Sequence, residues 1–78
     1  MKHAVARELK ASRIRNGMSQ KDVAKRLKIS VMTLARYEKT GNGLSIEKLE
    51  KILDLYGVDT LIFFRNVCDE KVKGKNYE

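Results

Sequence analysis

The sequence contains no proline, one cysteine and one histidine among its 78 residues, and each of these shortages excludes something. The single cysteine, Cys68, cannot form an internal disulfide, which fits a reducing cytoplasm. His3 and Cys68 stand far apart, and neither belongs to a metal-ligand spacing or a nucleophile motif. We therefore expect no metal, no cofactor and no catalytic residue. Without proline the apolar pattern runs uninterrupted, which favours a compact helical chain.

Long apolar runs are also absent. No stretch reaches the roughly 18 apolar residues that a membrane-spanning helix needs. Charged residues near the start occupy the place where a secretory signal has its apolar centre. We therefore expect a cytoplasmic protein without a membrane partner. A chain of 78 residues, of which 42% are hydrophobic, supports one folded domain with a small core.

Positive charge is concentrated in the first half of the chain. Residues 1–43 hold 11 lysines and arginines against three acidic residues, a net charge of +8, whereas residues 44–78 carry a net charge of −1. A field of one sign around one part of a small domain is typical of a surface that binds a polyanion such as DNA. The alternative is a solvated basic surface that only keeps the protein soluble.

Residues 19–38 show the pattern of two short helices joined by a tight turn. Ser19 and Ser30 each precede a helical apolar pattern, where a hydroxyl can accept from the unpaired N–H groups of a helix. The pattern predicts helices over residues 20–27 and 31–38, with the small Ala24 where the two helices cross. A helix-turn-helix of this kind presents its second helix to the major groove of DNA.

Two more helices are clear from their apolar stripes and their ends. The first covers about residues 4–15 and stops at Gly17. The other follows Ser45, repeats apolar side chains at helical spacing, and stops at Gly57. The helix-turn-helix therefore lies between two flanking helices.

The segment after Gly57 allows two interpretations. A fifth helix over about residues 59–67 is favoured, but residues 58–64 are also rich in strand-forming side chains. A lone strand in so small a domain would pair with the same strand of a second subunit. We expect one domain over residues 1–70, followed by a polar tail over residues 71–78.

The stretch from Leu9 to Phe64 resembles the Cro and phage-repressor (XRE-type) helix-turn-helix domain. The matching positions are Arg13, Asn16 to Gln20, Asp22 to Ala24, Leu27, Ile29, Ser30, Thr33, Leu34, Tyr37, Glu38, Ser45, Ile46, Leu49, Leu53, Gly57 and Val58. The resemblance implies an all-α, compact five-helix bundle. It also implies a sequence-specific transcriptional regulator, such as a repressor, whose partner is double-stranded DNA.

The resemblance assigns DNA contacts to two sets of side chains. Those expected to read bases are Val31, Met32, Thr33 and Arg36. Those expected to contact phosphate are Ser19, Gln20, Lys21, Lys39, Thr40 and Asn42. Arg36 can make a bidentate contact to guanine. Val31 and Met32 cannot hydrogen-bond through their side chains but can pack on thymine methyl groups. The alternative for Val31 and Met32 is packing in the core.

The resemblance also assigns a structural role to two charged residues. Arg13 and Glu38 are implied to form an ion pair that ties the first helix to the end of the third, because a guanidinium and a carboxylate match in two parallel hydrogen bonds. The sequence departs from the family at Lys28, where relatives often have glycine. We therefore expect the backbone at Lys28 to be either strained or differently wound.

The fifth helix carries more apolar side chains than one face of it can bury. We expect these side chains to form a homodimer interface: Leu61, Ile62, Phe63, Phe64 and Val67. A homodimer would act on a palindromic operator. The small size and this ending resemble the controller proteins of restriction–modification systems. The alternative is an antitoxin that binds DNA and neutralises a partner toxin.

Overall fold

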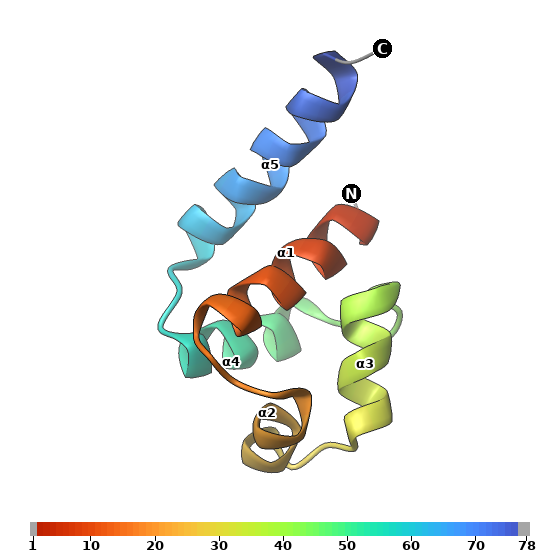
Figure 1. Cartoon of the computed structure of the whole chain (residues 1–78), viewed down its shortest axis with the longest axis vertical. Coiled ribbons are helices and arrows are strands. Elements are labelled where there is room, and N and C mark those ends of the chain that lie inside the picture. Colours follow the sequence, from red (N-terminus) through yellow and green to blue (C-terminus); the bar gives the residue numbers. More distant parts are fainter. Residues whose placement is uncertain (1, 77–78) are drawn as a thin grey trace.

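The computed structural model describes residues 2–76, with side chains as far as Asp69. These residues form five α-helices, so the all-α five-helix fold expected from the sequence is confirmed. In chain order the helices are α1 (Lys2–Arg15), α2 (Gln20–Leu27), α3 (Val31–Lys39), α4 (Ile46–Tyr56) and α5 (Thr60–Asn76) (Figure 1). The strand considered for residues 58–64 does not form, because helix α5 already begins at Thr60.

Polar side chains define where most of the helices begin. Ser19, Ser30 and Ser45 each accept a hydrogen bond from the backbone N–H three residues later, at 3.0–3.2 Å. The carboxylate of Asp59 caps α5, accepting from the N–H of Leu61, two residues later, at 2.8 Å and from that of Ile62 at 3.4 Å. Each such cap typically stabilises a helix by about 1 kcal/mol. The caps therefore fix the first residue of α2, α3, α4 and α5, and with it which side chains lie on each face of the helix.

Helix α5 is longer than the sequence indicated. The apolar stripe ends at Val67, where we placed the end of the helix, but the backbone stays helical to Asn76. Among the residues that follow Val67, Glu70, Lys71, Lys73 and Lys75 are good helix formers, and no proline interrupts the segment. The expected polar tail is therefore helical over residues 71–76, and its residues 77–78 lie outside the described part of the chain.

All five helices contribute to one core. Helix α1 packs against α3 on one side and α5 on the other, and the C-terminal half of α5 extends away from the other helices (Figure 1). The main buried side chains are Leu9, Val23, Ala24, Leu34, Tyr37, Leu49, Ile52, Leu53, Tyr56, Phe63 and Val67. Ala24 is only 1% exposed where α2 meets α3, as expected for a crossing that needs close backbone approach.

A buried carboxylate links α1 to α5. Glu8 is 8% exposed and accepts hydrogen bonds from Ser12 Oγ at 3.4 Å and from Asn66 Nδ2 at 3.3 Å. The guanidinium of Arg15 pairs with the same carboxylate oxygen. Burying a charge costs free energy unless the charge is paired and hydrogen-bonded, and these three donors offset that cost for Glu8. Because Asn66 belongs to α5, they also fix how α5 lies on α1.

The turn between α2 and α3 begins with a left-handed residue that is not glycine. Lys28 has φ 58°, the only positive φ of a non-glycine residue within residues 2–76. Gly57 ends α4 in the same conformation, with φ 67°. A side chain with a Cβ costs energy in this region, whereas glycine does not. The strained backbone expected at Lys28 is therefore present.

Replacing Lys28 with glycine should raise the free energy of unfolding by up to about 1 kcal/mol, because the strain disappears while the flexibility of glycine in the unfolded chain offsets part of the gain. The melting temperature, followed by circular dichroism, should rise by a few degrees. Lys25→Gly is the matched control. It removes the same charge from an exposed site inside α2 and should destabilise by about 1 kcal/mol. A Lys28→Gly protein that melts no higher than the wild type would contradict a strain at Lys28 larger than the entropic cost of glycine.

Candidate nucleic-acid interface

The first turn of α3 presents apolar side chains to solvent. Val31 is 43% exposed and Met32 is 83% exposed. Their position follows from the cap, because Ser30 Oγ accepts from the N–H of Thr33 at 3.0 Å and so fixes where the helix starts. Thr33 is partly buried, and its Oγ1 lies 2.8 Å from Ser30 Oγ. Of the residues expected to read bases, two are thus outward and apolar, and the third is engaged with the cap.

Arg36, the fourth expected base reader, is exposed but rests against the loop that follows α3. Its Nε donates to the carbonyl of Asn42 at 3.3 Å, and its guanidinium lies 5.8 Å from the centre of the Tyr37 ring. A Cβ at Gly43 would come within 3.5 Å of Arg36 Nη2, and φ at Gly43 is 80°. The loop after α3 therefore contacts the guanidinium of Arg36 and holds it near the surface of α3.

The side chains expected to contact phosphate fall into two groups. Lys21, Lys39 and Asn42 are exposed. Ser19, Gln20 and Thr40 already have partners within the chain, and of these three only Ser19 is exposed. Thr40 Oγ1 donates to the carbonyl of Arg36 at 3.2 Å. Gln20 Nε2 donates to Glu38 Oε1 at 3.0 Å.

The ion pair implied by the family resemblance is present and almost completely buried. Arg13 Nε and Nη2 donate to the two carboxylate oxygens of Glu38 at 2.7 and 3.2 Å. Arg13 Nη1 donates to the carbonyl of Met18 at 2.7 Å, and Glu38 also accepts from Gln20. The two parallel hydrogen bonds between Arg13 and Glu38 fix the relative orientation of the two side chains. Together with the bonds to Met18 and Gln20, they join α1, the linker after it, the start of α2 and the end of α3.

A tyrosine from α4 lies beside this pair. Tyr56 is 4% exposed, and its hydroxyl is the one buried side-chain polar atom without a hydrogen-bond partner in the described part of the chain. Burial raises the pKa of Tyr56 well above its ordinary value, the charge of Glu38 raises it further, and Arg13 lowers it. The hydroxyl therefore stays neutral beside the ion pair.

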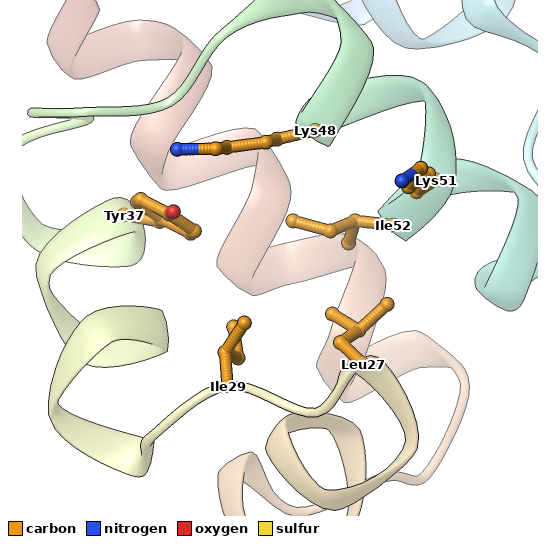
Figure 2. A pocket seen from close by; sticks show the side chains of 6 residues that line it. All are labelled: Leu27, Ile29, Tyr37, Lys48, Lys51 and Ile52. Carbon is orange, nitrogen blue, oxygen red and sulfur yellow. The ribbon is translucent and has the colours of Figure 1, made fainter.

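A shallow pocket separates the helix-turn-helix from α4 (Figure 2). Its volume is about 270 Å³, and its lining residues are Leu27, Ile29, Tyr37, Lys48, Lys51 and Ile52. Lys48 Nζ donates to the carbonyl of Gly43 at 3.3 Å. The two lysines bring positive charge from α4 to the side of α3. Lys48 and Lys51 are not among the DNA contacts expected from the sequence, because they belong to the half of the chain with no net positive charge.

The expected dimer residues do not share one surface. Leu61 and Ile62 are 80% and 55% exposed, whereas Phe63 and Val67 are 0% exposed. Phe64 is partly buried and makes an edge-to-face contact with Phe63 at 5.4 Å between ring centres. The expectation is therefore corrected for Phe63 and Val67, which form part of the core of the chain. The consecutive apolar residues 61–64 do not by themselves reveal which of them face inward.

A family model described as helix-turn-helix matches residues 9–63. The chain therefore belongs to the XRE-type helix-turn-helix family of DNA-binding transcription regulators, which are not enzymes. No curated protein sequence matches the chain. No helix within the described residues is long and apolar enough to cross a membrane.

Solved structures of a restriction–modification controller protein, C.Esp1396I, are similar to the chain. The wild-type protein in a triclinic crystal form has a TM-score of 0.84 and 26% identity, over 92% of this chain and 94% of that one. Another wild-type structure has a TM-score of 0.77 and 26% identity, over 87% of each chain. A structure of one of its variants has a TM-score of 0.83 and 27% identity, over 91% and 92%. The likeness therefore extends over nearly the whole of both chains.

Replacing Glu38 with alanine should lower the free energy of unfolding by about 3–5 kcal/mol, because it leaves the buried guanidinium of Arg13 without its counter-charge. Thermal unfolding should show a large fall in melting temperature. Glu50→Ala is the control, since it removes a carboxylate from an exposed position on α4 and should change stability by less than about 0.5 kcal/mol. Equal melting temperatures for the two variants would mean that the ion pair does not hold the helices together.

Proposed function

We propose that this protein is a sequence-specific transcriptional regulator that binds a palindromic operator as a homodimer. One observation carries the proposal: the outer surface of α3, with Met32 83% exposed, projects from a helix-turn-helix that a buried ion pair holds in place. Its likeness to a restriction–modification controller protein supports the regulatory role. Binding to DNA would place the protein inside the cell, in line with the cytoplasmic location expected from the sequence.

The need for two copies follows from what one helix can read. A single recognition helix contacts only a few base pairs, so two helices on half-sites one turn apart give the necessary specificity. Leu61 and Ile62 offer exposed apolar surface on α5. Partly buried Phe64 and exposed Ile46 line one surface pocket of about 240 Å³. Exposed apolar side chains of this kind are a surface that a second copy of the chain can cover.

The mechanism is occupancy of the operator. Helix α3 enters the major groove, while Lys21 and Lys39 neutralise phosphates on either side of it. Bound protein then blocks or recruits RNA polymerase. Because each phosphate contact releases counterions, affinity should fall steeply as salt concentration rises.

Selection of the purified protein against random DNA duplexes at about physiological salt tests the proposal. We expect an enriched palindrome with half-sites about 10 base pairs apart. Repeating the selection with Arg36→Ala should relax one base position in each half-site and cost about 1–3 kcal/mol of binding free energy. Lys10→Ala is the control, since it removes one charge from an exposed site of α1 and should leave the selected sequence unchanged. Salt-sensitive binding without any enriched sequence would refute a sequence-specific regulator.

The dimer is tested by a charge placed on α5. Ile62→Glu should convert the protein from dimer to monomer in sedimentation equilibrium, because a carboxylate would be buried against the partner copy. Ile14→Glu is closely matched, since Ile14 is 57% exposed and Ile62 is 55% exposed, but Ile14 lies on α1. This control should remain dimeric. A monomeric wild-type protein, or a dimer that Ile62→Glu does not weaken, would contradict the interface on α5.

A further inference from the structure

The first turn of α3, the part proposed to enter the major groove, presents apolar side chains to solvent. Its two most exposed residues at the first turn are Val31 and Met32, and neither side chain can donate a hydrogen bond. Both belong to the helix end that Ser30 caps. Contact with base edges in this region therefore depends on apolar packing.

The polar side chains nearby are already engaged. The hydroxyl of Thr33 is paired with that of Ser30 at 2.8 Å, so its capacity to form further hydrogen bonds is reduced. Arg36 stands one turn later and is seated on the loop through the carbonyl of Asn42. The hydrogen-bonding side chain of Arg36 therefore lies one turn away from the first turn of α3, whose most exposed side chains are apolar.

The major groove offers one apolar feature that such side chains can recognise. Thymine carries a methyl group at C5, and a cytosine methylated at C5 presents the same group at the same place. Uracil and unmodified cytosine lack it. A thioether and a branched aliphatic side chain pack well against a methyl group, and Met32 can adapt its three rotatable bonds to the contact.

We propose that Val31 and Met32 select operator half-sites by the C5-methyl groups of pyrimidines, an inference that rests on the proposed function. Burying one methyl group corresponds to about a fourfold change in affinity. The affinity for the operator should therefore fall when uracil replaces a thymine that faces α3. It should rise when a cytosine that faces α3 is methylated at C5.

The test uses the duplex that the selection experiment yields. Each thymine of a half-site is replaced in turn by uracil, and affinity is measured by fluorescence anisotropy at fixed salt. At one or two positions in each half-site we expect a loss of about fourfold. Uracil placed outside the half-sites is the control and should have no effect. At the same positions, 5-methylcytosine should bind about fourfold more tightly than cytosine.

The variant Met32→Ala assigns the effect to this side chain. Because Met32 is 83% exposed, the variant should fold as the wild type does. With Met32→Ala, the difference between thymine and uracil should disappear at one position, while the other positions keep theirs. Val31→Ala should act in the same way at a neighbouring position.

The outcomes separate this inference from the proposed function. Specific binding with equal affinity for thymine and uracil everywhere in the half-sites would overturn the methyl readout and leave the regulator intact. A selected half-site without thymine opposite α3 would also overturn the readout. Failure to select any sequence would instead refute the proposed function itself.

Discussion

The arrangement of the helices depends on the buried pair between Arg13 and Glu38. A buried charge is costly unless its partners are complete, and here the guanidinium bonds two carboxylate oxygens and the carbonyl of Met18. The carboxylate in turn accepts from Gln20 at the start of α2. The angle at which α3 projects is therefore set by an interaction inside the protein, at the end of the helix opposite to the exposed Met32.

Much of the fold could be predicted because local signals agree with one another. The serine caps gave the correct starts of α2, α3 and α4, and Gly57 gave the end of α4. The end of α5 could not be predicted, because the apolar stripe stops at Val67 while charged residues continue the helix. Nor could the inward-facing Phe63 be distinguished from its neighbours in the apolar run of residues 61–64. The buried Val67 lies beyond Arg65 and Asn66, one helical turn after Phe63.

The candidate site was predictable to the extent that it depends on helix phase. Once Ser30 caps α3, the exposure of Met32 follows. The hydrogen bonds that Gln20 and Arg36 make within the protein could not be predicted. Gln20 bonds to Glu38 and Arg36 bonds to the carbonyl of Asn42, and these residues meet only in the folded chain. The DNA contacts themselves stay predictions, since they depend on a partner that the fold alone does not define.

The exposure of Val31 and Met32 also bears on how such a protein can change over generations. Substitutions at exposed positions usually alter stability by less than about 0.5 kcal/mol. Residues that hold α3 in place, such as Glu38, are buried and separate from those at its first turn. Duplicated copies of this chain can therefore diverge in the sequences they recognise, one substitution at a time, without passing through misfolded ancestors. The same separation makes the helix surface a practical starting point for engineering new specificities.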